Sequence, residues 1–178
     1  IDEKEIIRFQ ESIKQSKLLY EKFIVFLTDI NFEIHDLTKN DHKYWLELYL
    51  KYAEYYEVEI PEDNFNLTWE WINDDEQSLQ GIIAKSDNKF IGFAHFRSIP
   101  SPLESCEIGF LDDLYVLPEF RGYKIGFSLI ERVRQIGENK GWPYINWITK
   151  DNNYNARMLY DKIATKTDWN FYELVVKK

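Results

Sequence analysis

The spacing of hydrophobic positions changes repeatedly along the chain, between the alternation typical of strands and the longer period typical of helices. Phe32–Leu37 alternates as a short strand does, and the helical pattern after it runs to about Tyr56, where Ile60-Pro61 ends it. The further elements expected are a helix over 63–75, strands over 79–85, 90–99 and 106–117, a helix over 126–140, a strand over 144–149, a helix over 153–164 and a last strand over 169–176. The order βααβββαβαβ predicts an α/β or α+β domain on one central sheet.

Residues 3–30 carry a separate helical pattern. Apolar side chains recur every seven positions at Ile6, Ile13, Tyr20 and Leu27, and Ser16 interrupts the adjoining row. We therefore expect an N-terminal helical extension over residues 1–31, followed by one domain over 32–178. The pattern fits a helix docked on that domain, and it also fits the seam of a homodimer.

Length, composition and charge exclude several classes of protein. The chain has 178 residues, the size of one domain, and its 44% hydrophobic and 17% aromatic content excludes a disordered chain. A net charge of −9 argues against binding nucleic acid through phosphates and favours a cationic partner. A single cysteine cannot form an internal disulfide, and the three histidines are too far apart to indicate a metal site. We expect a cytoplasmic protein without a membrane span.

A strand, a short glycine-containing loop and a helix follow one another around residue 120. The loop contains Arg121, Gly122, Lys124 and Gly126, and the amphipathic helix begins directly after it. Glycine permits close backbone approach, and the first turn of a helix has unpaired N–H groups at its positive end. The segment therefore predicts an anion-binding loop with room for a diphosphate.

This loop resembles the acetyl-CoA signature of the GNAT N-acetyltransferase superfamily, and the order of elements from Phe32 to Val176 is similar to that fold. The resemblance implies a central, mixed, mostly antiparallel sheet flanked by helices, with acetyl-CoA as co-substrate. One position departs from the signature, because Lys124 stands where glycine is usual; it is expected either to contact the coenzyme or to point to solvent. The coenzyme contacts that the resemblance implies are Leu114, Tyr115, Val116, Arg121, Gly122, Tyr123, Lys124, Ile125, Gly126, Phe127 and Asn153.

A second segment, Asn152–Tyr160, resembles the Asn…Ala…Leu-Tyr segment of the same superfamily. Asn153 and Tyr160 are seven residues apart, so they share one face of the expected helix. The resemblance implies that Asn153 lies near the pantetheine and that Tyr160 is the acid for the leaving thiolate, a role that suits a phenol. The alternatives are a helix cap for Asn153 and core packing for Tyr160.

The stretch Leu111–Val116 is similar to a Leu-Glu-Asp-Phe-Phe-Val run of the histone/polyamine and diamine (spermidine/spermine) acetyltransferase subgroup. The resemblance implies that Asp112 is a base acting through water. Acetylation of an amine needs such a base, because removing a proton from the ammonium group at neutral pH costs about 4 kcal/mol. Adjacent strand residues point to opposite faces, so only one of Asp112 and Asp113 is expected to face the site.

Residues 52–84 contain nine acidic side chains and no Lys or Arg, interleaved with aromatic rings. Such a surface can bind a small cationic amine, a polyamine or diamine being preferred; a solvated acidic face is the alternative. The expected substrate contacts are Tyr56, Glu57, Trp69, His95 and Asp113. Other candidate acceptors are a protein lysine and an aminoglycoside, and a non-catalytic coenzyme A sensor is the alternative of a different class.

Overall fold

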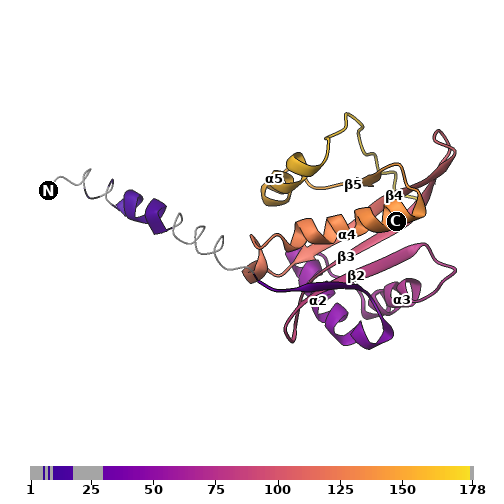
Figure 1. Cartoon of the computed structure of the whole chain (residues 1–178), viewed down its shortest axis with the longest axis horizontal. Coiled ribbons are helices and arrows are strands. Elements are labelled where there is room, and N and C mark those ends of the chain that lie inside the picture. The colour runs from indigo at the N-terminus through magenta and orange to yellow at the C-terminus, as the bar shows by residue number, and fades with distance from the viewer. Residues whose placement is uncertain (1–5, 7, 9, 18–29, 177–178) are drawn as a thin grey trace. The chain divides into compact units, whose positions relative to one another are not determined.

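The computed structural model describes residues 6, 8, 10–17 and 30–176, and the chain divides into two compact units, 1–147 and 148–178. Each unit is described by itself. The first contains β1 (Glu33–Asp36), α2 (His42–Tyr55), α3 (Glu62–Ile72), β2 (Leu79–Ser86), β3 (Lys89–Ser101), β4 (Cys106–Val116), α4 (Ile125–Lys140) and β5 (Ile145–Trp147), with 3-10 turns at Lys39–Asp41 and Pro118–Phe120 (Figure 1). The second contains α5 (Tyr154–Ile163).

The five strands form one sheet in the order β1-β2-β3-β4-β5. Neighbouring strands are antiparallel from β1 to β4, and β5 pairs with β4 in parallel. The prediction of a mixed, mostly antiparallel sheet flanked by helices is therefore confirmed. The strand predicted over 144–149 is shorter than expected, because only Ile145–Trp147 pairs with β4.

Helices cover the sheet closely enough to bury both of its faces. Ile82, Ile83 and Ala84 are consecutive on β2 and fully buried, which requires cover on both sides of the strand. Helix α2 contacts β3, and α4 contacts β2, β3 and β4. The core beside α2 consists of Trp45, Leu48, Ile83, Phe93, Tyr115 and Leu117.

The predicted N-terminal helix over 3–30 lies largely outside the described residues. Residues 6, 8 and 10–17 are helical, and Ile30 is not. Ile6 and Ile13, two of the heptad positions, are 46% and 53% exposed. Docking on the domain and a dimer seam both remain predictions for this segment.

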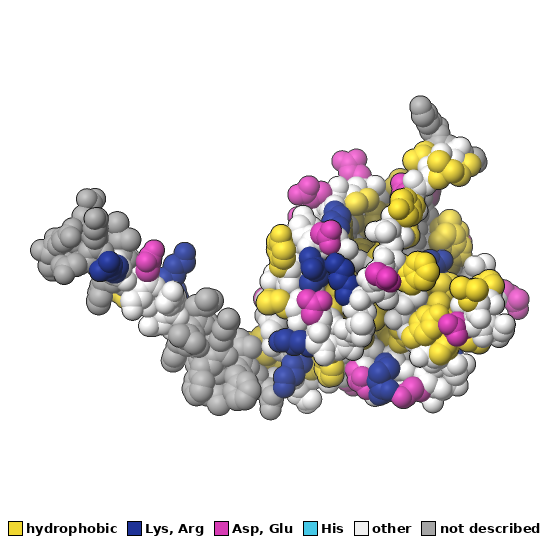
Figure 2. Space-filling model, turned by 90° about the horizontal axis from the view of Figure 1, so that it is seen from above, with side chains coloured by type: hydrophobic (Ala, Val, Ile, Leu, Met, Phe, Trp, Pro, Cys, Tyr) yellow, Lys and Arg dark blue, Asp and Glu magenta, His cyan; other side chains and the backbone are white. Residues whose placement is uncertain are grey.

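The predicted last strand over 169–176 is wrong, because these residues form no helix or strand. Their apolar side chains are exposed, from 66% at Val175 to 89% at Val176 (Figure 2). A strand needs a partner for its hydrogen bonds, and no other strand lies among the described residues of the second unit. None of the described helices has the length and apolar content that crossing a membrane requires.

Candidate active site

One edge of β4 loses its strand partner halfway along. The parallel pairing with β5 covers Gly109–Leu111 and stops there, whereas the pairing with β3 continues to Val116. Among the described residues, the backbone of 112–116 therefore has a strand partner on one side only. A free strand edge can hydrogen-bond an extended amide-bearing ligand, and pantetheine is such a group. The predicted contacts Leu114, Tyr115 and Val116 lie on this edge.

The loop after β4 leads into α4 through two residues with positive φ. Gly122 has a φ of 88°, and Lys124, at the N-cap of α4, has a φ of 63° and a ψ of 6°. Lys124, which stands where the signature usually has glycine, therefore adopts a left-handed backbone conformation. That conformation costs a residue with a Cβ about 1–2 kcal/mol. The first helical hydrogen bond runs from Ser128 N to Lys124 O, so the amides before Ser128 precede the hydrogen-bond ladder of α4. These amides are therefore the ones that an anion at the start of α4 could contact.

Side chains of this loop differ in what they can offer the coenzyme. Ile125 is buried, so only its backbone can face a ligand, whereas Phe127 is 40% exposed and Tyr123 is half-buried. Arg121 Nε donates to Val116 O over 3.0 Å, and its guanidinium lies 5.0 Å from the Tyr55 ring centre. In this structure Arg121 therefore ties the loop to the end of β4 and to α2.

The two adjacent aspartates on β4 point to the same side of the sheet, which corrects the expectation of opposite faces. Phe96 pairs with Leu111 and His95 pairs with Asp113, so Asp112 is an extra residue that forms a β-bulge. Asp113 contacts His95 and Asp112 contacts Arg97, and these two partners lie on the same face of β3. The bulge interrupts the alternation and brings both carboxylates together.

Asp113 lies at the end of a set of hydrogen bonds. Tyr52 OH donates to its Oδ1 over 2.6 Å, and His95 Nδ1 lies 2.9 Å from its Oδ2. Trp45 Nε1 in turn donates to His95 Nε2 over 2.7 Å. Burial alone would raise the pKa of Asp113, but the hydrogen bond and electrostatic attraction of His95 and the hydrogen bond from Tyr52 outweigh it and hold that pKa below its usual value.

Asp112 has the opposite environment. Its Oδ1 lies 3.1 Å from Arg97, while its Oδ2 is buried and has no hydrogen-bond partner among the described residues. Burial raises the pKa of Asp112, and the nearby Arg97 only partly opposes that rise. Two neighbouring carboxyl groups whose pKa values move apart are suited to different roles.

The predicted substrate contacts are only partly available at the surface. Trp69 packs into the core, its ring 4.8 Å from Trp45, and His95 is 1% exposed with both ring nitrogens engaged. Any part of His95 in the reaction therefore acts through Asp113. Glu57 is exposed in a left-handed conformation after α2, and Tyr56 is half-buried, its pKa raised by burial.

In the second unit, Asn153 precedes α5 and Tyr160 lies on it, half-buried. Asn153 occupies the N-cap position, but its side-chain amide donates to Thr149 Oγ1 over 3.1 Å instead of capping the helix. The side-chain cap considered from the sequence is therefore not formed. The predicted roles of Asn153 and Tyr160 towards the coenzyme remain proposals.

Sequence reasoning missed Trp45 and Tyr52. They are seven residues apart on α2, so they face the sheet from one side of the helix. That spacing was the available signal, but their partners His95 and Asp113 lie 50 and 61 residues away along the chain.

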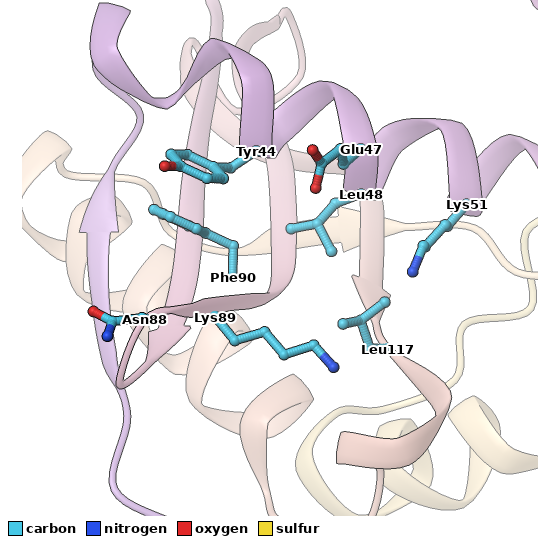
Figure 3. A pocket seen from close by; sticks show the side chains of 8 residues that line it. All are labelled: Tyr44, Glu47, Leu48, Lys51, Asn88, Lys89, Phe90 and Leu117. Carbon is cyan, nitrogen blue, oxygen red and sulfur yellow. The ribbon is translucent and has the colours of Figure 1, made fainter.

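A pocket elsewhere in the first unit is lined by none of the predicted site residues. Tyr44 and Phe90 stack with ring centres 4.2 Å apart at one end (Figure 3). Lys89, which also lines the pocket, pairs with Glu119 over 2.8 Å. No group of His, Cys, Asp and Glu side chains that could hold a metal occurs among the described residues, and Cys106 is exposed.

Comparison with known proteins agrees with the fold. The family model described as "Acetyltransferase (GNAT) family" matches residues 45–164. A D-amino-acid N-acetyltransferase of Saccharomyces cerevisiae is 30% identical over 135 residues, covering 75% of this chain and 84% of that protein. A thialysine N-epsilon-acetyltransferase of Mus musculus is 37% identical over 51 residues, 29% of this chain and 30% of that protein.

Solved structures with the same fold include acetyltransferases. An aminoglycoside N-acetyltransferase in complex with coenzyme A has a TM-score of 0.71 at 22% identity, covering 83% of this chain and 96% of that one. A ribosomal-protein-alanine N-acetyltransferase from Brucella melitensis has a TM-score of 0.69 at 23% identity, covering 82% and 99%. At these identities the likeness shows the fold alone.

Proposed function

Since the chain belongs to the GNAT acetyltransferase family, we propose that it transfers acetyl from acetyl-CoA to a primary amine of a small polycation, a polyamine or a diamine, by direct attack in a ternary complex. The observation that carries the proposal is the carboxylate pair Asp112–Asp113 on one face of the bulged β4. Such a pair can divide two tasks of an amine acetyltransferase, one carboxylate binding the ammonium group and the other accepting its proton.

Asp112 is the base in this proposal. Its Oδ2 lacks a donor, and a carboxylate oxygen without a donor gains more from a proton than a hydrogen-bonded one does. The raised pKa of Asp112 brings it closer to the amine in proton affinity, which eases proton transfer through water.

Asp113 is the binding group for the ammonium. It stays ionised because two donors hold it, and its side chain is 20% exposed. The exposed acids of the α2–α3 segment, Glu57 among them, add a negative field that attracts a second positive charge of the substrate.

The free edge of 112–116 and the first turn of α4 are proposed to bind the pantetheine and diphosphate parts of acetyl-CoA. When bound, acetyl-CoA supplies the activated acyl group. Tyr160 is proposed to protonate the leaving thiolate, and Asn153 to contact the pantetheine.

An amino-acid amine is the second candidate acceptor, and a specific observation favours it. The match to the yeast D-amino-acid N-acetyltransferase spans 75% of the chain. A carboxylate-bearing acceptor needs a cationic group in the site, and Arg97, 45% exposed beside Asp112, is available for that.

The test is a coenzyme A release assay on polyamines, diamines, D- and L-amino acids, aminoglycosides and lysine peptides. We expect the highest kcat/KM with a polyamine or diamine, and a loss of at least about 100-fold in kcat for Asp112→Asn. Asp87→Asn, which removes an exposed charge from the turn between β2 and β3, outside the acidic segment 52–84, is the matched control and should retain activity. Acetyl-CoA binding without turnover of any amine would instead favour a coenzyme sensor.

A further inference from the structure

A line of hydrogen bonds leads from the core to the carboxylate of Asp113. Trp45 is fully buried and His95 is 1% exposed, whereas the Asp113 side chain is 20% exposed. The links are Trp45 Nε1 to His95 Nε2 at 2.7 Å, and His95 Nδ1 to Asp113 Oδ2 at 2.9 Å. We call this set the Trp-His-Asp relay.

The chemistry of the indole decides where the His95 proton lies. An indole N–H only donates, so His95 Nε2 must offer its lone pair to Trp45. An imidazole whose Nε2 accepts is neutral and carries its proton on Nδ1. The Nδ1–H then donates to Asp113 Oδ2, and Tyr52 OH donates to Oδ1. Both oxygens of Asp113 accept, which is the arrangement of an ionised carboxylate.

We propose that Trp45 is a positioning residue for amine binding: by fixing His95 as the Nδ1–H tautomer, it keeps Asp113 anionic and correctly oriented for the substrate ammonium group. This inference rests on the proposed function, in which the acceptor is a cationic amine. It assigns to a buried tryptophan an effect on substrate affinity rather than on stability alone.

The charges around His95 show why its protonation state matters. Asp113 and Asp112 act on it electrostatically from β4, and Arg97 on β3 pairs with Asp112. From α2, the Tyr49 ring lies 5.1 Å away edge-on and stays neutral, since burial raises the pKa of that phenol to about 12. A second proton on His95 would place an imidazolium against Asp113 and cancel the charge that binds the amine.

The Trp45 N–H occupies the direction from which that second proton would bind. While the indole donates to Nε2, protonation of Nε2 would set two N–H groups against each other at 2.7 Å. Trp45→Phe keeps an aromatic ring and removes the donor, so Nε2 becomes available to a proton. Asp113 then loses its effective charge as the pH falls.

The first test reads the tautomer in the wild-type protein, without substrate. Long-range 1H–15N NMR of histidine-labelled protein should show His95 protonated on Nδ1 and unprotonated on Nε2 from about pH 8 to about pH 6. An Nε2–H tautomer, or a doubly protonated ring in that range, overturns the proposal. The result does not depend on activity, so it stands apart from any failure of the proposed function.

The second test compares Trp45→Phe with Trp69→Phe, using spermidine as the amine. Trp69 packs 4.8 Å from Trp45 in the same core and is not one of the three relay residues, so it controls for lost packing. For Trp45→Phe we expect the spermidine KM to rise about 10-fold between about pH 8 and about pH 6, relative to wild type and to Trp69→Phe. The KM for acetyl-CoA should stay unchanged.

Parallel pH profiles for the two variants would overturn the proposal, because a packing effect alone would give them. If Trp45→Phe does not fold, the wild-type tautomer decides. Absence of turnover with spermidine in the wild type would count against the proposed acceptor, while the NMR result would still confirm or refute the relay.

Discussion

Asp112 and Asp113 are neighbours on β4, yet removing their charges should change the stability of the protein in opposite directions. Asp113→Asn replaces a carboxylate that accepts from Tyr52 and His95 by an amide with one acceptor. Asp112→Asn replaces a carboxylate whose Oδ2 has no donor among the described residues. The first change removes a favourable charge, and the second removes an unfavourable one.

The magnitudes follow from these contacts. A hydrogen bond to a charged group contributes about 1.5–3 kcal/mol, so losing one at Asp113 should lower the free energy of unfolding by about 2 kcal/mol. The partly exposed Arg97–Asp112 pair contributes about 0–1 kcal/mol, and the unpartnered Oδ2 costs about 1–3 kcal/mol. Asp112→Asn should therefore be neutral or stabilising by about 1 kcal/mol. At about 2–4 °C per kcal/mol, the two Tm values should differ by roughly 5–10 °C.

The direction of each pKa shift determines how the stability contribution of each aspartate changes with pH. The folded pKa of Asp113 lies below its unfolded value, so its contribution is complete above about pH 4 and disappears as the pH falls through the folded pKa. The folded pKa of Asp112 is raised, so its cost is absent below about pH 4 and appears as the pH rises through the folded pKa.

Thermal unfolding of both variants between about pH 3 and about pH 7 measures this, with Asp75→Asn, at an exposed site, as the control. The difference between the variants should be largest near neutral pH and should shrink in acid. The reasoning is refuted if Asp112→Asn destabilises the protein at neutral pH as much as Asp113→Asn does.

Three further predictions concern the loop, the acceptor segment and the acid. Lys124→Gly should stabilise the fold by about 0.5–1 kcal/mol, because relief of the left-handed strain exceeds the entropy cost of glycine. Lys124→Ala removes the charge but keeps the Cβ, so it should not stabilise the fold. Calorimetry measures both variants, and equal stabilities would contradict the backbone strain at this position. Glu57→Gln with Glu59→Gln should raise the amine KM at low salt and leave the acetyl-CoA KM nearly alone, and unchanged KM values would make the segment a solvated face. Tyr160→Phe should fold and lose about 10²–10⁴-fold in kcat, and retention of more than about half, with chemistry rate-limiting, would exclude the acid role.

Local signals in the sequence were sufficient for most of the elements and for the turn into α4. Gly122 and Gly141 both adopt positive φ, the first in the predicted anion-binding loop and the second at the predicted end of α4. Pro61 precedes α3, as the helix break at Ile60-Pro61 indicated. These features depend on the residue itself and on its nearest neighbours, which is why spacing and residue type predicted them.

The carboxylate site depends on contacts that spacing does not encode. The period-two rule assigned Asp112 and Asp113 to opposite faces, and a single bulge opposite His95 and Phe96 made that assignment wrong. The alternation in 169–176 likewise predicted a strand, but alternation provides no hydrogen-bond partner. Register and pairing are properties of two strands together, and one strand's sequence does not contain them.

The bulge also explains why the two halves of the proposed site adjoin. Pairing of β4 with β5 ends at Leu111, and the extra residue in the pairing with β3 is Asp112, the next position. A bulge increases the local twist and bends the strand, so the residues from Asp112 onward follow another course than those that pair with β5. The free edge proposed for pantetheine and the carboxylate pair proposed for the amine therefore begin at the same residue. A donor bound along 112–116 and an amine bound at Asp113 would meet without any movement of the sheet.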